Sequence, residues 1–149
     1  IDIRDNPGGN LDTVVEMLRQ ILPEGVIVTT KDRDGTAEEY TCDGAHEFTK
    51  PLAVLVNGSS ASASEVFAAA VKDYGIGTIV GETTFGKGVV QDVIGLRDGS
   101  SVKITTAEYF PPSGESINKK GVKRMWRLNL SRIRTIRRRI TNWKKRLRS

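Results

Sequence analysis

The segment NGSSASASEVFAAA, residues 57–70, places several serines just before a predicted helix. Residues 52–56 form a continuous apolar run that is typical of a buried strand, and the helical pattern covers residues 64–74. A serine at a turn from strand to helix lies exposed beside free backbone N–H groups. Small side chains also allow two backbones to approach closely. The segment therefore predicts either tight packing or a nucleophilic serine.

A second segment with chemical potential is GETTFGKGVVQ, residues 81–91. A serine hydroxyl becomes a good nucleophile only when a neighbouring base takes its proton. A lysine can be that base only when it is neutral, and a free lysine has a pKa near ~10.4, so its site must remove it from water. Phe85, Val89 and Val90 supply apolar groups around Lys87. The amide of Gln91 can orient the lysine amine without adding a charge.

Other nucleophiles were weighed against these two segments. The serine run contains three rivals, namely Ser59, Ser60 and Ser64. Ser64 is followed by Glu65, and helix capping or packing explains that pair more simply. His46 is the only histidine, so a Ser–His pair is the alternative catalytic arrangement, but its loop CDGAHEF offers no recognisable partner.

Metal and thiol chemistry have weaker support. Cys42 is the only cysteine, so neither a disulfide framework nor a cysteine metal cluster can form within the chain, and as a nucleophile it ranks below His46. Asp32, Asp34 and Glu38 could suggest a calcium loop, but their spacing matches no known ligand pattern and a turn explains them. We expect no metal and no cofactor.

Strands and helices alternate along the first 122 residues. Ile1 and Ile3 are typical of a strand end, and apolar residues repeat at helical spacing over residues 11–21. Residues 26–30 and 38–41 predict one hairpin, and residues 89–96 and 101–109 predict another around an Asp-Gly turn. A short strand is expected at residues 78–80. This order predicts an α/β fold in one globular unit.

Three segments in this order, DIRDNPGG, LVNGSSASASE and GETTFGKGVVQ, resemble the catalytic-core signatures of the carboxyl-terminal processing peptidases, the tail-specific serine proteases. The resemblance covers residues 1–122. It implies a Clp-protease and crotonase-like α/β core. It also implies a Ser–Lys catalytic pair in place of a Ser–His–Asp triad.

Individual roles follow from this resemblance. Ser62 matches the nucleophile of the family, Lys87 matches the general base, and Gln91 matches the glutamine that accompanies the pair. The resemblance assigns the oxyanion hole to the backbone N–H groups of Gly9 and Ala63. A glycine suits that role because no side chain obstructs its N–H group.

The resemblance also implies a substrate and a setting. Family members cleave proteins near their C-termini, and a PDZ domain that precedes DIRDNPGG recruits the exposed C-terminal segment as an added strand. This chain has no such domain, so we expect residues 1–122 to be the C-terminal part of a longer peptidase core, truncated at its N-terminus and weakly active or inactive alone. The implied location is the cell envelope or another extracytoplasmic space, and no transmembrane segment is expected here.

Charge divides the chain into an acidic body and a basic tail. Residues 123–149 hold 12 of the 23 Lys and Arg and none of the 18 Asp and Glu, so residues 1–122 hold 11 basic against 18 acidic groups, a net charge of −7. Two functions other than a peptidase remain as alternatives. One is a non-catalytic binding or scaffold protein with the same core, and the other is nucleic-acid binding through the tail, which we do not expect.

We interpret the basic tail as the product of a frameshift. Met125 and Trp126 each have a single codon, so the gene reads ATGTGG there and the frame displaced by one base contains a valine codon. With consistent codon choices, the displaced frame reads an acidic strand followed by a helix start, as the family's C-terminus does. We expect residues 123–149 to have no selected function.

Overall fold

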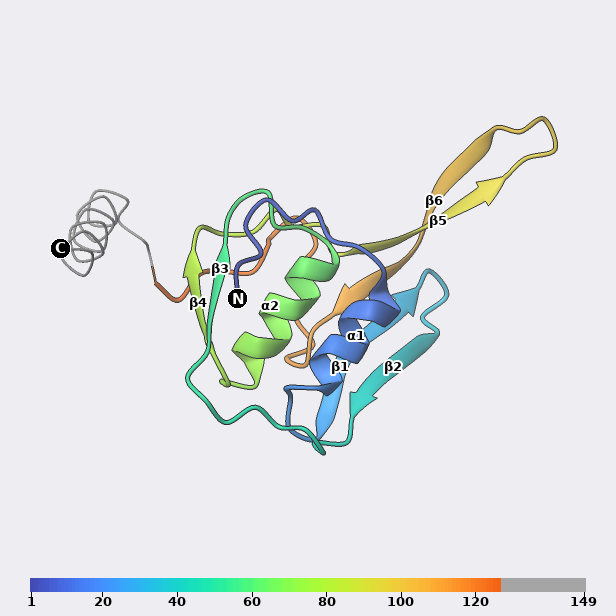
Figure 1. Ribbon diagram of the computed structural model, residues 1–149. Coiled ribbons are helices and arrows are strands. Elements are labelled where there is room, and N and C mark those ends of the chain that lie inside the picture. Colours follow the sequence, from blue (N-terminus) through green and yellow to red (C-terminus); the bar gives the residue numbers. More distant parts are fainter. Residues whose placement is uncertain (127–149) are drawn as a thin grey trace, which may run out of the picture.

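The computed structural model describes residues 1–126, in which two helices pack against two sheets (Figure 1). The elements are α1 (Leu11–Arg19), β1 (Gly25–Asp32), β2 (Ala37–Cys42), β3 (Ala53–Val56), α2 (Ala63–Asp73), β4 (Thr78–Gly81), β5 (Val89–Gly95) and β6 (Ser101–Phe110). The predicted α/β class, both helices and the six strands after residue 20 are confirmed with boundaries within two residues, whereas the strand end expected at residues 1–3 forms only an isolated bridge between Asp2 and Leu55. The interpretation of the tail beyond Trp126 lies outside the described residues.

Helix α1 begins at a polar cap and presents one apolar face. The side chain of Asn10 accepts a hydrogen bond from the Thr13 N–H at 3.1 Å, which satisfies one of the free donors of the first turn. Val14, Val15 and Leu18 are buried, as their helical spacing predicts. The last turn ends at Arg19 because the chain turns before Pro23, which cannot continue a helix.

The smaller sheet is parallel and is extended by short segments at both edges. Strands β3 and β4 pair in parallel, and the first residues of the chain lie along β3, with the Ile3 N–H donating to Leu55 O at 3.0 Å. Trp126 forms an isolated bridge to Val80 on the other edge. In β3, Val54 is buried, whereas Ala53 on the opposite face is exposed. The continuous apolar run at residues 52–56 predicts burial on both faces, and that prediction is wrong. Helix α2 packs against one face of this smaller sheet.

The larger sheet is antiparallel, in the order β2-β1-β6-β5. Both helices contact β1, so the main core lies between the helices and the two sheets. Its members are mostly Val, Leu, Ile and Ala with one Phe, and the fully buried ones include Leu18, Leu22, Ile27, Val54, Val71 and Ile79. None of the helices among residues 1–126 is long and apolar enough to cross a bilayer.

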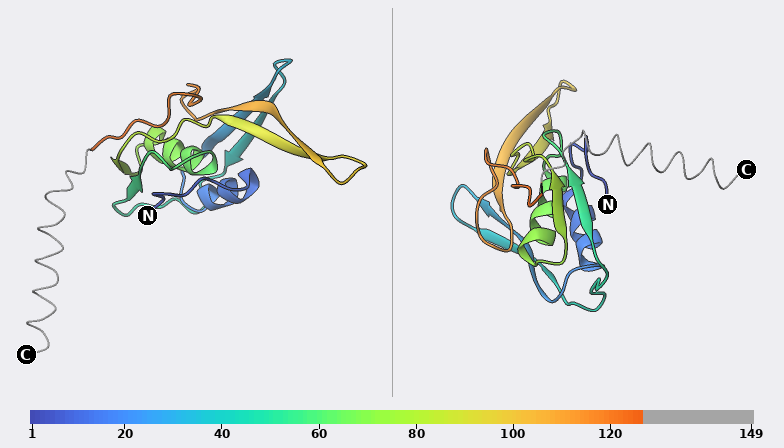
Figure 2. Two further views of the ribbon diagram at one scale, coloured as in Figure 1. Left: turned by 90° about the horizontal axis from the view of Figure 1, so that it is seen from above. Right: turned by 90° about the vertical axis from the view of Figure 1, so that its left-hand side faces the viewer.

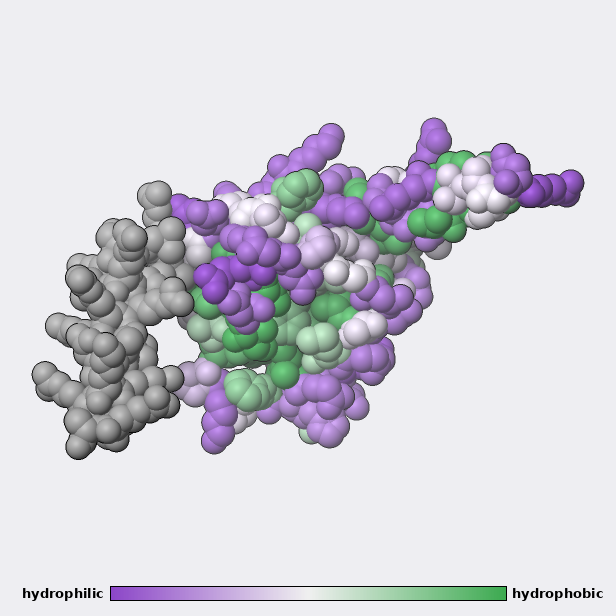
Figure 3. Space-filling view, turned by 45° about the horizontal axis from the view of Figure 1, so that its top comes forward, coloured by the Kyte–Doolittle hydropathy of each residue, from purple (hydrophilic) through white to green (hydrophobic). Residues whose placement is uncertain are grey.

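The distal part of the β5–β6 hairpin projects away from this body, as two further views show (Figure 2). We call residues 92–104 the arm. Apolar side chains gather on the arm in the space-filling view, where green patches lie among polar ones (Figure 3). Alternating apolar residues in a strand usually face a core, but these apolar side chains of the arm are exposed: Val93, Ile94, Leu96, Val102 and Ile104.

Candidate active site

Ser62 lies at the N-cap of α2 in an unusual backbone conformation. Its φ is 56° and its ψ is −121°, a region that residues with a side chain rarely adopt. Such strain persists only where the surroundings fix it, and it is concentrated at functional sites. A serine in this geometry between a strand and a helix is the arrangement of a nucleophile elbow. The side chain is 8% exposed.

Gly8 packs directly against this turn. A Cβ atom at Gly8 would lie 2.6 Å from the carbonyl oxygen of Ala61 and 2.8 Å from the Cβ of Ser62. The φ of Gly8 is +100°, which also favours glycine. The segment NPGG therefore approaches the serine turn as closely as two backbones can.

The rival serines hold that approach in place. The Ser60 hydroxyl donates to Ile3 O at 2.7 Å, and the Ser64 hydroxyl donates to Asn6 O at 3.1 Å. Both side chains are buried, so their hydroxyls are used in binding the N-terminal segment. Ser59 is exposed and does not join this contact.

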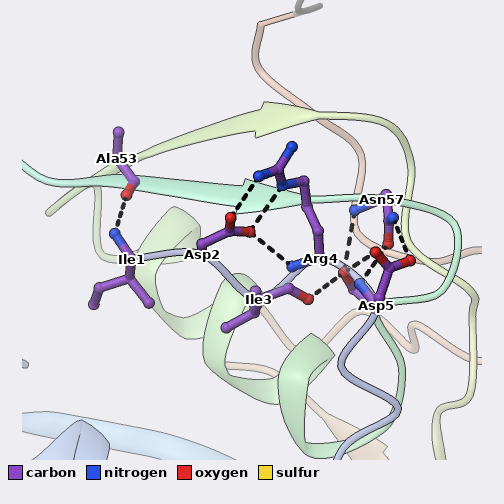
Figure 4. A network of polar contacts seen from close by, with 8 residues as sticks. Ile1, Asp2, Ile3, Arg4, Asp5, Ala53 and Asn57 are labelled. Atoms are coloured by element: carbon purple, nitrogen blue, oxygen red, sulfur yellow. Dashed lines mark hydrogen bonds and ion pairs between the residues drawn. The ribbon is translucent and has the colours of Figure 1, made fainter.

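A polar network at the start of the chain completes the attachment (Figure 4). The Asn57 side chain donates to the Asp5 carboxylate at 2.8 Å and accepts from the Asp5 N–H at 3.0 Å. Asp2 accepts two hydrogen bonds from the Arg4 guanidinium. The Arg4 side chain lowers the pKa of Asp2 to about 2. Ile3, Asp5 and Asn6 are thus hydrogen-bonded to the loop that carries Ser62.

The two residues assigned to the oxyanion hole line the same cavity. Within residues 1–126 neither the Gly9 N–H nor the Ala63 N–H has a hydrogen-bond acceptor. Gly9 and Ala63 both line one cavity of about 220 Å³ between α1 and α2. Apolar side chains of Val14 and Phe67 form part of its wall. Free donors beside a cavity can stabilise a developing negative charge.

The backbone of Lys87 is hydrogen-bonded to the first turn of α2. Its N–H donates to the Glu65 carboxylate at 2.7 Å, and its side chain is half-buried. In the described part of the chain its ammonium group makes no hydrogen bond or ion pair. Phe85 is 67% exposed, and the apolar cover that the sequence predicted over Lys87 stays a prediction. The pairing of Lys87 with Ser62 stays a prediction.

Gln91 was predicted to contact Lys87, whereas Tyr109 was not predicted to belong to the site. The Gln91 amide donates to the Thr105 hydroxyl at 3.4 Å, so its proposed contact with the lysine also stays a prediction. Burial of Tyr109 raises the pKa of its hydroxyl, and the nearby Ser62 side chain offsets this only in part. Tyr109 was not found from the sequence, because a tyrosine in an alternating strand has no distinguishing signal.

The alternative nucleophiles lie elsewhere. His46 is exposed beside Arg19 and Gln20 at the C-terminal end of α1, whereas Gly8 meets the Ser62 turn before the N-terminal end of that helix. Nine helical residues, about 13 Å, separate these two ends. The arrangement offers no Ser62–His46 pair.

Cys42 and Asp32 have structural roles. The Cys42 thiol is buried and donates to Leu22 O at 3.4 Å. The Asp32 carboxylate accepts from two backbone N–H groups of its own turn, which is the turn explanation given above. Residues 1–126 contain no group of three His, Cys, Asp or Glu side chains that could hold a metal ion.

Comparison with known proteins agrees with this geometry. The model of peptidase family S41 matches residues 1–125. The chain belongs to peptidase family S41. It is 44% identical over 122 residues to a carboxyl-terminal-processing protease of Synechocystis sp., covering 82% of this chain and 29% of that protein. It is 46% identical over 123 residues to the chloroplastic C-terminal processing peptidase of Tetradesmus obliquus, covering 82% of this chain and 26% of that protein.

A solved structure supports the same relationship. The chain is similar to the photosystem II D1 C-terminal processing protease with a TM-score of 0.78 and 45% identity, over 85% of this chain and 33% of that one. The resemblance drawn from three motifs is therefore confirmed. The chain spans between about a quarter and a third of the length of these S41 peptidases.

Proposed function

We propose that residues 1–122 form the C-terminal part of the catalytic core of a serine endopeptidase that cleaves proteins near their C-termini. The crotonase-like arrangement of that core is part of this proposal. The observation that carries the proposal is the strained backbone of Ser62 at the start of α2, and the Gly9 and Ala63 N–H groups, which have no acceptor within residues 1–126, support it. The names of the S41 relatives support the reaction class.

The reaction follows serine-peptidase chemistry with lysine as the base. The Ser62 hydroxyl attacks the carbonyl carbon of the scissile bond, and its proton passes to the neutral amine of Lys87. The N–H groups of Gly9 and Ala63 stabilise the resulting oxyanion, each by roughly 3 kcal/mol. The C–N bond then breaks as the leaving amine takes the proton from Lys87. Water attacks the acyl-enzyme by the same route and regenerates Ser62, while Gln91 orients the lysine.

The contact between Ser62 and Tyr109 is compatible with this mechanism. Catalytic hydrogen bonds are often absent or long before substrate binds and form in the complex. In the proposal, substrate binding turns the Ser62 hydroxyl from Tyr109 toward Lys87. The substrates are proteins with exposed C-termini, and the setting is the cell envelope or another extracytoplasmic space, by analogy with bacterial and chloroplastic relatives. Nucleic acid has no part in it.

The test uses a chimera in which residues 1–122 replace the matching segment of the Synechocystis protease, because that protein supplies the rest of the length. We expect the chimera to cleave a peptide substrate, and Ser62→Ala and Lys87→Ala each to reduce kcat at least about 10³-fold. Gln91→Ala should lower kcat less. Ser59→Ala and Lys103→Ala change exposed residues of the same types and should leave cleavage unchanged.

A fluorophosphonate that reacts with activated serines gives the second measurement. The folded chimera should be labelled at Ser62 and the Ser62→Ala variant should not. A chimera that unfolds cooperatively on heating but neither cleaves peptide nor reacts with the probe would show a binding or scaffold protein instead. Full activity in Lys87→Ala would exclude the Ser–Lys pair.

A further inference from the structure

Glu65 is the most deeply buried charged residue described here, with an exposed fraction of 0%. A carboxylate in such a position is costly unless hydrogen bonds replace the water it has lost. Both of its oxygens are in fact occupied. Oε1 accepts from the Thr84 hydroxyl at 2.6 Å and from the Gly86 N–H at 2.7 Å. Oε2 accepts from the Lys87 N–H at 2.7 Å and from the Ser62 N–H at 3.0 Å.

These four hydrogen bonds exceed what a helix cap requires. A glutamate three residues after the N-cap ordinarily closes a capping box with one bond to the N-cap N–H. Here that bond goes to Ser62, and the other three donors belong to residues 84–87, about twenty residues further along the chain. Glu65 therefore joins two separate segments that both carry proposed catalytic groups.

We propose that Glu65 is the positioning residue that fixes the nucleophile turn and the lysine loop to each other. The role rests on the proposed function, because it concerns how Ser62 and Lys87 come together. In this role, the Glu65 carboxylate sets the distance between the backbone of Ser62 and the backbone of Lys87.

The bond to Ser62 explains how the strained turn is maintained. The Ser62 N–H donates to Oε2, and the adjacent Ala63 N–H, at the first position of α2, has no acceptor within residues 1–126. The bond from Glu65 therefore fixes the residue next to the proposed oxyanion donor. The unfavourable φ of 56° is tolerated because the carboxylate and the close approach of Gly8 both constrain this turn.

The bonds to the second segment fix the base. Lys87 has a flexible side chain with no hydrogen bond in the described residues, so its amine can be placed only through its backbone. Thr84 extends the network, since its hydroxyl donates to Glu65 and accepts from the Val122 N–H at 2.7 Å. The lysine loop is therefore held between the start of α2 and the segment that follows β6.

The experiment compares Glu65→Gln with Glu82→Gln, an exposed glutamate at the end of β4. Glutamine has one acceptor oxygen, and its NH₂ group would face N–H donors. In the ¹⁵N-labelled 149-residue chain we expect the amide signals of Ser62, Gly86 and Lys87 to move together in Glu65→Gln and to stay fixed in Glu82→Gln. In the chimera, we expect labelling of Ser62 per folded molecule to fall about 10²-fold in Glu65→Gln.

A second pair of variants removes the dependence on one substitution. Thr84→Val deletes one donor to Glu65 and should lower the labelling rate by a smaller factor, whereas Thr84→Ser keeps the hydroxyl and should restore it. This pair decides the question if Glu65→Gln does not fold. A purely structural role would lower the folded fraction in both Thr84→Val and Glu65→Gln without changing the labelling rate of the folded molecules.

The two proposals fail in different ways. Loss of labelling in the parent chimera would remove the proposed peptidase function, while the amide signals would still report whether Glu65 joins the two segments. Labelling of Glu65→Gln at the rate of Glu82→Gln, with unchanged Ser62 and Lys87 amides, would overturn the positioning role alone.

Discussion

Two regions of this molecule reverse the usual relation between polarity and burial. We call residues 60–65 together with 84–87 the junction. Among residues 1–126, six polar or charged residues are buried. One is Thr30, and the other five lie in the junction: Ser60, Ser62, Ser64, Glu65 and Thr84. In the arm, by contrast, Val93 is 66% exposed and Ile94 is 50% exposed.

The difference concerns what each region needs in order to be stable. Every buried side-chain N or O atom among residues 1–126 has a hydrogen-bond partner, so the junction is complete within the described chain. The arm gains little from its apolar side chains because they remain in water. The proposed chemistry therefore depends on polar residues whose burial is fully compensated, whereas the apolar side chains of the arm are not covered in this form.

The largest expected effect comes from Gly8→Ala. Its methyl group would overlap the Ala61 carbonyl and the Ser62 side chain, at a φ of +100°. We expect a loss of about 2–5 kcal/mol in the free energy of unfolding from overlap and strain together. Urea denaturation of the 149-residue chain measures it.

The neighbouring Gly9→Ala is the matched control for this overlap. A Cβ at Gly9 meets nothing within 4 Å, so the same change in composition should leave the urea midpoint nearly unchanged. Equal destabilisation by the two substitutions would mean that the close approach at Gly8 is not what holds the junction.

An intermediate effect distinguishes a buried valine from one in the arm. Val56 is 1% exposed and Val102 is 41% exposed. We expect Val56→Thr to cost about 1–3 kcal/mol, because a hydroxyl replaces a methyl group in the core, and Val102→Thr to stay within about 0.5 kcal/mol. Urea midpoints compare them. A cost for Val102→Thr as large as that for Val56→Thr would show that the arm is packed in solution.

The smallest effect concerns Asp2 at the surface. Its pKa is lowered from 3.8 to about 2 by the Arg4 side chain, so the contact stabilises the folded chain fully above pH about 4 and is lost as the pH falls toward 2. The difference in thermal midpoint between the parent and Asp2→Asn should shrink over this interval. A difference that stays constant from pH 5 to about 2 would contradict this assignment.

Much of the fold could be predicted because local pattern decides it. Apolar spacing found α1, and an Asp-Gly turn found the β5–β6 hairpin, since both signals depend on neighbouring residues. The alternation in the arm correctly predicted strands but not their exposure, because a pattern states which residues share a face and not what covers it.

The site was only partly within reach of the sequence. Ser62 and Gly9 were assigned from a resemblance, and the positive φ of Ser62 supports the first assignment independently. The sequence explained Glu65 together with Ser64 by helix capping or packing, but the capping bond of Glu65 goes to the Ser62 N–H and is only one of its four hydrogen bonds. The other three depend on residues 84–87 lying beside α2, and no local signal encodes such a distant contact.

The wide sequence separation within the junction has a consequence for the folding of a protease. Glu65 and its partners at residues 84–87 lie on opposite sides of β4 in the sequence, and Thr84 contacts Val122, thirty-eight residues later. Non-local contacts of this kind form late, because the intervening chain must first close. A partly folded chain would therefore lack both the fixed turn and the docked lysine loop. The proposed catalytic residues would then come together last, so under the proposed function a partly folded molecule would not cleave its unfolded copies.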